Sequence, residues 1–274
     1  MRVLILGEVV GRAGYTAVKR ALKTIDNIDL TIANVEGMAN GWGCGKVNAI
    51  NLMKAGVDIL TGGEKLFFKP DMQAFVTETS KVIRPYNYPL PESIGHGVKY
   101  VKVGESTIAV INLLGQNGLR PTLNNPFVAI DYPLKKAKET AKAVIVVFHS
   151  SASAEKQTMF HYLDGRVSAV IGTHTKVMTN DALVSEKGTA YITDNGRCGS
   201  TLSVGGLDAE TEIKKLRTNL PLRSRECFDK TELQGVIVEI GENGEATNIE
   251  KVKIPVEIDK SEFLKPLKER NEEL

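Results

Sequence analysis

The sequence predicts an α/β fold built on a mixed sheet or on a two-sheet sandwich. Apolar runs rich in valine and isoleucine recur at intervals of roughly 25 to 50 residues, and helical patterns lie between several of them. This alternation is typical of β-α-β units around a central sheet with helices on its faces. Two doubled strand patterns indicate antiparallel hairpins, so the sheet is not expected to be purely parallel.

The expected strands are short and rich in branched residues, and they span residues 2–7, 30–35, 57–63, 106–113, 143–149 and 168–174. Helical patterns cover residues 17–25 and 47–56, and Gly56 stands where a helix commonly ends. One hairpin is predicted to turn at Gly104 and Glu105, and the other at residues 242–244. No internal repeat or low-complexity linker interrupts the pattern, so a single domain is expected.

Composition limits the function classes. The chain has 274 residues, 42% of them hydrophobic, and a formal charge of +2, which argues against binding a nucleic-acid duplex through bulk electrostatics. No segment approaches the roughly 20 apolar residues that span a bilayer. The three cysteines are odd in number and widely spaced, so neither a disulfide framework nor a zinc knuckle is indicated. We expect a cytoplasmic protein without a membrane partner.

Polar side chains gather at the ends of the expected strands, where the chemistry of such folds is usually located. They are Glu8, Asn34, Glu36, Glu64, Lys65, Asn112, His149, His174 and Lys176. Carboxylates and neutral imidazoles are ligands that suit zinc, manganese or iron, which indicates a metal site if the fold brings these groups together. A lone histidine at a strand end is more often a structural residue whose hydrogen bonds are satisfied.

Several stretches carry a resemblance to a known family. They are GEVVGRAG at 7–14, TIANVEG at 31–37, RPYNYP at 84–89, VINLLG at 110–115, FHSSASAEK at 148–156, YLDGRVSAVIGTHT at 162–175, GTAYITDNG at 188–196 and GVIVEI at 235–240. On these residues the chain resembles the YmdB-like family of calcineurin-type metallophosphoesterases. The resemblance implies a metallophosphoesterase-like domain over residues 1–250, followed at 251–274 by a strand end and a charged tail.

The resemblance implies a four-layer α/β/β/α sandwich with mixed sheets. It also implies the chemistry of phosphodiesterases that use two metal ions, some of which act on 2′,3′-cyclic nucleotides. Members of the family are often oligomeric, so a homo-oligomer is expected by analogy.

The first metal site of the family departs most from its pattern in this chain. The family's aspartate ligand is replaced by Glu8, and its last histidine ligand is replaced by Lys176, whereas the bridging carboxylate is kept as Glu36. Because an ammonium group repels a divalent cation, we expect this first site to hold no metal.

The second site keeps more of the family's ligands. Its asparagine becomes Glu64, the two histidines are kept as His149 and His174, and Glu36 would complete the set. The family's proton-donor histidine becomes Lys65, and a lysine ammonium is a poor general acid at neutral pH. The sequence therefore allows either one divalent metal (iron, manganese or zinc) at this site or none.

Charge compensation offers the alternative to metal. Three buried carboxylates, Glu8, Glu36 and Glu64, would be strongly destabilising without partners. Lys65 and Lys176 supply two fixed cations, so the five residues are predicted to form a salt-bridge network in place of the two-metal centre.

Three functions remain open. The favoured hypothesis is a pseudoenzyme with lost or strongly reduced phosphodiesterase activity that binds a small-molecule phosphate ligand or a protein partner. The alternatives are an active phosphoesterase with a rearranged one-metal centre, and a metal-free enzyme that uses Lys65 or Lys176 for other chemistry. Trp42, in a glycine-rich loop, would either cover the mouth of the pocket or anchor a partner.

Overall fold

Two mixed sheets form the centre of the molecule in the computed structural model, which describes residues 1–89, 91, 94–119, 122–259, 261 and 263. The first sheet has seven strands in the order β13-β12-β11-β1-β2-β3-β4. Its strands are β1 (Arg2–Val9), β2 (Leu30–Asn34), β3 (Ile59–Thr61), β4 (Val82–Ile83), β11 (Arg197–Ser200), β12 (Thr231–Ile240) and β13 (Ala246–Pro255). The strands β11, β1, β2, β3 and β4 run parallel. The strand β12 is antiparallel to β1 and β11, and β13 is antiparallel to β12.

The second sheet has six strands in the order β5-β6-β7-β8-β10-β9. Its strands are β5 (Val98–Val103), β6 (Ser106–Leu114), β7 (Ala143–His149), β8 (Ala169–Thr173), β9 (Leu183–Val184) and β10 (Ala190–Ile192). The central strands β6, β7, β8 and β10 are parallel, and the edge strands β5 and β9 are antiparallel to their neighbours.

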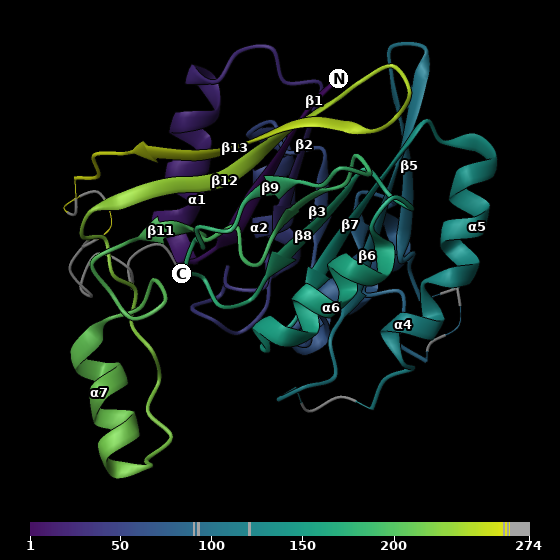
Figure 1. Cartoon of the computed structure of the whole chain (residues 1–274). Coiled ribbons are helices and arrows are strands. Elements are labelled where there is room, and N and C mark those ends of the chain that lie inside the picture. Colours follow the sequence, from purple (N-terminus) through teal and green to yellow (C-terminus); the bar gives the residue numbers. More distant parts are fainter. Residues whose placement is uncertain (90, 92–93, 120–121, 260, 262, 264–274) are drawn as a thin grey trace.

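Three hydrophobic cores separate four layers. One core lies between the two sheets and contains side chains of both, such as Ile5 and Ile145. A second packs the other face of the first sheet against α1 (Gly11–Ala21), α2 (Lys46–Lys54) and α3 (Pro70–Glu78). The third packs the second sheet against α5 (Asp131–Thr140) and α6 (Ser153–Leu163), with α4 (Pro126–Ala129) beside them (Figure 1). The expected four-layer sandwich with mixed sheets is confirmed.

Both predicted hairpins are present. Val103 pairs with Ser106 across the turn at Gly104, which has a φ of +57° and so takes the left-handed conformation that glycine adopts without strain. The second hairpin joins β12 to β13 and turns through Gly244, which also has a positive φ of +85°.

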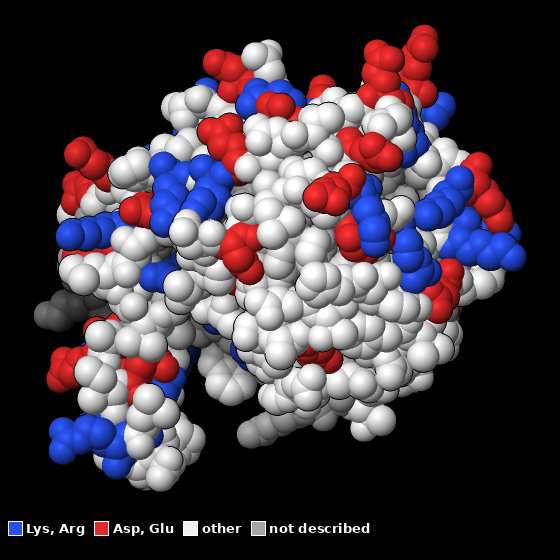
Figure 2. Space-filling model, viewed as in Figure 1, with Lys and Arg blue, Asp and Glu red and all other residues white. Residues whose placement is uncertain are grey.

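The C-terminal part of the chain begins with the end of a strand. The strand β13 continues to Pro255, so residues 251–255 are the strand end that was expected after residue 250. Most of the charged tail lies outside the described residues. The helix α7 (Ala209–Thr218), which the periodicity did not predict, has no buried residue and projects away from the body (Figures 1 and 2).

Basic and acidic side chains are interspersed on the face shown in Figure 2, and the α7 segment is separated from the body there by an open gap. Across the described ranges, no helix combines the length and apolar character that crossing a bilayer requires.

Candidate functional site

The expected site residues meet at one edge of the sandwich, where parallel strands of both sheets end. Glu8 lies near the end of β1 and His149 is the last residue of β7. Glu36, Glu64 and His174 follow β2, β3 and β8 within three residues of each strand end. Parallel strands direct their carboxyl ends to the same side, so residues from distant parts of the chain converge there.

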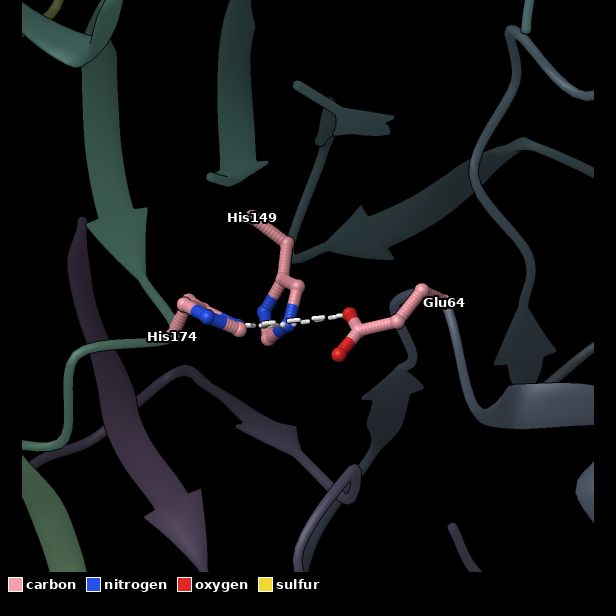
Figure 3. A group of neighbouring side chains, drawn as sticks. All are labelled: Glu64, His149 and His174. Carbon is pink, nitrogen blue, oxygen red and sulfur yellow. Dashed lines mark hydrogen bonds and ion pairs between the residues drawn. The ribbon is translucent and has the colours of Figure 1, made fainter. Parts of the chain in front are cut away.

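Glu64, His149 and His174 form the centre of the site (Figure 3). His149 Nε2 lies 3.0 Å from His174 Nδ1 and 3.1 Å from Glu64 Oε2, and the third side of the triangle, His174 Nδ1 to Glu64 Oε2, measures 4.0 Å. The two imidazole rings stand nearly perpendicular, at 89°. Two ring nitrogens and one carboxylate oxygen therefore point toward a common space.

This donor set fits a divalent transition metal. Bonds of about 2.0–2.2 Å in a tetrahedral arrangement place ligand atoms about 3.3–3.6 Å apart, and the observed separations of 3.0 to 4.0 Å bracket that range. Glu64 Oε2 is also buried, and its neighbours within 4 Å are the ring nitrogens of His149 and His174, which donate to it only when they carry a proton. A buried carboxylate oxygen without a fixed donor is the kind of atom that a cation completes.

Two neighbours orient the His149 ring through its other nitrogen. Thr173 Oγ1 lies 2.8 Å from His149 Nδ1, and Asn34 Nδ2 lies 3.2 Å from it. A proton on Nδ1 donated to Thr173 leaves Nε2 free to bind a metal, as in the outer-shell contacts of known sites. Donation from Asn34 to Nδ1 instead places the proton on Nε2, the tautomer that does not bind a metal. The sequence analysis identified neither Thr173 nor the role of Asn34.

The loop that carries His174 is backbone-strained. His174 has a φ of +104° and Lys176 a φ of +62°, and a side chain at such angles is uncommon and costs about 1–3 kcal/mol. The backbone amide of Thr175, between them, donates to Asp194 Oδ2 at 2.8 Å. The same oxygen accepts from Lys156 Nζ at 2.9 Å, in an ion pair whose side chains are both fully buried. Lys156 and Asp194 thus hold this loop, and sequence reasoning missed both.

Lys176 occupies the other half of the site. Its ammonium nitrogen lies 3.2 Å from Oε1 of Glu8, a carboxylate that is 1% exposed. The negative charge of Glu8 is the main cause that raises the pKa of Lys176, and it outweighs burial, which acts in the opposite direction. A cation therefore stands beside the carboxylate where the resemblance implies the first metal.

Glu36 does not join the Glu64–His149–His174 group. Its carboxylate accepts from the backbone amide of Gly63 at 2.5 Å and from that of Lys65, so both oxygens are already bound to the loop after β3. Burial, helped by the charges of Glu64 and Glu8, raises the pKa of Glu36 to about 7. The four-ligand set expected for the second site is thus reduced to three residues among those described.

Lys65 lies beside Glu64, with Nζ 3.3 Å from Oε1. Each oxygen of Glu64 has a different partner: Oε1 contacts Lys65, and Oε2 contacts the histidines. The Glu–Lys network expected from the sequence is therefore resolved into two separate ion pairs, Lys65–Glu64 and Lys176–Glu8, while Glu36 is held by backbone amides.

The charge states in the site follow from these contacts. Burial, reinforced by the neighbouring His149, lowers the pKa of His174 to about 3, which keeps its imidazole neutral at physiological pH. Burial alone would raise the pKa of Glu64, but the hydrogen bond and charge of His149 outweigh it and hold that pKa well below its usual range. Glu64 is thus an anion and His174 a neutral donor, as metal ligation requires. Burial alone would lower the pKa of His149, but the hydrogen bond and charge of Glu64 outweigh it and raise that pKa, so a metal would have to displace a proton from His149.

Comparisons with known proteins agree with this fold. A family model described as YmdB-like protein matches residues 4–252. A 2′,3′-cyclic-nucleotide 2′-phosphodiesterase from Bacillus subtilis is 38% identical over 258 residues, covering 93% of this chain and 97% of that protein. The crystal structure of a novel phosphatase from Mycoplasma pneumoniae has a TM-score of 0.87 and 28% identity, covering 96% of this chain and 99% of that one. A putative 5′-nucleotidase from Staphylococcus aureus shares the fold at a TM-score of 0.59 and 16% identity, covering 99% of this chain and 57% of that one.

Proposed function

The chain belongs to the YmdB-like protein family, and we propose that it is a phosphodiesterase-type protein with one divalent metal held by Glu64, His149 and His174 and with strongly reduced activity. The observation that carries this proposal is the triangle of donor atoms from three strand ends, with a buried carboxylate oxygen at one corner. A divalent ion held there would act as a Lewis acid toward a phosphoryl oxygen.

Reduced activity follows from the groups that stand in the rest of the site. Two-metal phosphoesterases stabilise the attacking and the leaving oxygen with separate cations. Here the Lys176 ammonium, paired with Glu8, stands in the place of one of them. Lys65 holds the position of the family's proton donor and pairs with Glu64, so it can neutralise phosphate charge but is a weaker acid than a histidine.

The substrate class is proposed from the Bacillus relative, which is named for hydrolysis of 2′,3′-cyclic nucleotides and matches nearly the full length of both chains. Glu64 can keep its contact with Lys65 through Oε1 while Oε2 faces the histidines. The Glu64 carboxylate can therefore bind a metal through Oε2 and hold the Lys65 ammonium near the phosphate through Oε1.

A second candidate is a metal-free protein that binds a phosphate ester without hydrolysing it. The observation that favours it is Asn34, whose side-chain oxygen accepts from the backbone amide of Glu36 at 3.0 Å, an arrangement that directs its amide donor at His149 Nδ1. The proton of a neutral His149 would then sit on Nε2 and occupy the space between the three donors.

Elemental analysis separates the two candidates. Wild type, His174→Ala and the matched control His161→Ala, an exposed histidine on α6, are purified without chelator. The proposal expects about one zinc, manganese or iron per chain in wild type and control, and its loss in His174→Ala. Hydrolysis of 2′,3′-cyclic AMP is then measured on the same samples and is expected to require the bound metal. Absence of metal from the wild type would reject the proposal in favour of the metal-free protein.

A further inference from the structure

We propose that Trp42 and Phe68 form a nucleobase-binding subsite beside the Glu64–His149–His174 centre. This inference rests on the proposed function, because it assigns the part of the site that would recognise the substrate's base. Of the two roles expected for Trp42, this subsite assigns it to the pocket and not to the anchoring of a protein partner.

A cavity of about 580 Å³ joins the aromatic side chains to the centre. Its walls include Trp42 and Phe68 at one part and Glu64, Lys65 and His174 at another. Small-molecule sites are concave, mostly apolar, and about 300–1,000 Å³ in volume, with a few polar groups that fix orientation. The cavity therefore offers an aromatic surface and a charged surface to one ligand.

The two aromatic side chains at this cavity are half exposed. Trp42 is 54% exposed and Phe68 is 50% exposed, and their ring centroids lie 6.0 Å apart with planes tilted by 35°. Exposed aromatic rings in a nucleotide-binding groove are surfaces on which bases stack, and the interaction tolerates different bases because each has a π-face.

The Trp42 loop is fixed to the backbone that carries the charged residues. Gly43 has a φ of +79°, and a side-chain carbon added there would overlap the carbonyl oxygen of Lys65. The amide of Gly43 also donates to the carbonyl of Glu36 at 2.9 Å. The glycine therefore permits a close approach of two backbones and places Trp42 at a set position relative to Glu64 and Lys65.

A second aromatic pair supports the loop that carries the centre. Phe67 packs edge-on against Tyr88 with ring centroids 5.7 Å apart, and the Tyr88 hydroxyl donates to the carbonyl oxygen of Glu64 at 3.4 Å. Tyr88 also lines the cavity, so the aromatic wall continues from Trp42 and Phe68 toward the metal ligands.

The chemistry of the cavity points to a nucleotide. The charged part of the cavity, with Glu64, Lys65 and His174, suits a phosphate through its lysine, and the exposed rings suit a planar base. A sugar phosphate would satisfy only the charged part and leave the two rings in water. The ligand class is therefore a nucleoside phosphate whose base stacks on Trp42 and Phe68.

Trp42 is the only tryptophan of the chain, so its fluorescence reports this subsite directly. The full chain is titrated with adenosine 5′-monophosphate and, separately, with ribose 5-phosphate, using excitation at wavelengths where adenine does not absorb. Adenosine 5′-monophosphate is expected to quench Trp42 saturably and to bind about 5- to 150-fold more tightly than ribose 5-phosphate, the range that stacking of one base gives.

Variants test the partner ring. Phe68→Ala is expected to weaken adenosine 5′-monophosphate binding by a similar factor and to leave ribose 5-phosphate binding unchanged. The matched control is Tyr132→Ala, since Tyr132 is 64% exposed and lies on α5. Circular dichroism verifies the fold of each variant. Equal affinity for the two ligands, or an unchanged affinity in Phe68→Ala, overturns the inference.

A fluorescence titration with adenosine, in wild type and in His174→Ala, separates this inference from the proposed function. Adenosine is expected to quench Trp42 equally in wild type and His174→Ala, because the base does not contact the metal ligands. Base-dependent quenching in a protein that holds no metal and hydrolyses nothing would reject the proposed function and retain the subsite. If the protein binds metal and hydrolyses 2′,3′-cyclic AMP but shows no quenching of Trp42 by the base, the proposed function stands and the nucleobase subsite is rejected.

Discussion

Lys176 Nζ lies 3.2 Å from Oε1 of Glu8, so a lysine on the loop after β8 neutralises a carboxylate at the end of β1. The Glu8 side chain is 1% exposed and that of Lys176 is 17% exposed. The pair joins the two sheets at the edge where the candidate site lies.

Removal of the Lys176 charge is expected to destabilise the protein. Lys176→Met leaves Glu8 buried without a compensating cation, and breaking a buried ion pair in this way costs about 3–5 kcal/mol. Urea denaturation measures the loss. The control Lys187→Met breaks a pair with Asp164 in which the lysine side chain is 68% exposed, and it should cost about 1 kcal/mol or less. The double variant Glu8→Gln/Lys176→Met should recover most of the stability; similar losses in both single lysine variants would contradict the buried-pair account.

Replacement of Lys176 by histidine is expected to open the first metal position. Lys176→His removes the fixed cation and adds a neutral nitrogen ligand beside Glu8, so the metal content should rise from about one to about two ions per chain. Elemental analysis and hydrolysis of 2′,3′-cyclic AMP provide the readouts. Lys176→Gln, which removes the charge without adding a good ligand, serves as the control. A metal content that stays the same in both variants would show that Lys176 is not what prevents binding there.

Glu36 is expected to make the stability of the metal-free protein fall as pH rises. Its pKa is raised from 4.5 to about 7 by burial, so between these values the folded chain holds a proton that the unfolded chain has lost. Stability from this group is complete below pH 4.5 and decreases through pH 7, by roughly 3 kcal/mol in total.

Glu36→Gln mimics the protonated carboxyl and should remove this dependence. In chelator-treated protein the unfolding free energy of the variant should stay level from pH 5 to above pH 7 while that of wild type falls, because only the wild-type carboxyl must ionise in a buried position. The glutamine NH2 cannot accept from the amide of Gly63 or Lys65, so the variant is compared by its pH dependence and not by its absolute stability. Glu139→Gln, which alters a half-exposed pair with Lys136, is the control and should change little. Parallel stability curves for wild type and Glu36→Gln would disprove the raised pKa.

Gly43→Ala is expected to disturb both stability and the Trp42 environment. The added carbon would overlap the Lys65 carbonyl oxygen at a positive φ, so the cost should exceed the strain of the backbone angle alone, which is about 1–2 kcal/mol. Gly104→Ala isolates that strain, because Gly104 has a positive φ with no atom within 4 Å of the added carbon. Denaturation midpoints and tryptophan emission are measured for both. If Gly43→Ala loses no more unfolding free energy than Gly104→Ala and the tryptophan emission is unchanged, the close approach of Gly43 to the Lys65 carbonyl is unimportant.

The sequence was sufficient for the alternating architecture. The runs at residues 143–149 and 168–174 correspond to β7 and β8 almost to the residue, because buried parallel strands are continuous branched apolar segments. The hairpin turns were also predictable, since a glycine at a positive φ is a local requirement. The helix α7 was not predicted; its Ile213 and Leu216 are spaced to share one face of a helix, but both are exposed.

The sequence by itself determined which ionisable residues stand at the strand ends, and with them the exchange of two expected metal-site histidines for Lys65 and Lys176. Only the tertiary structure decided how those groups pair. Lys176 takes Glu8, Lys65 takes one oxygen of Glu64, and Glu36 turns to backbone amides, which leaves the other Glu64 oxygen to face the two histidines. Apart from the pairing of the adjacent residues Glu64 and Lys65, these choices depend on short distances between chain segments far apart in sequence, and on burial, which removes water as a competing partner.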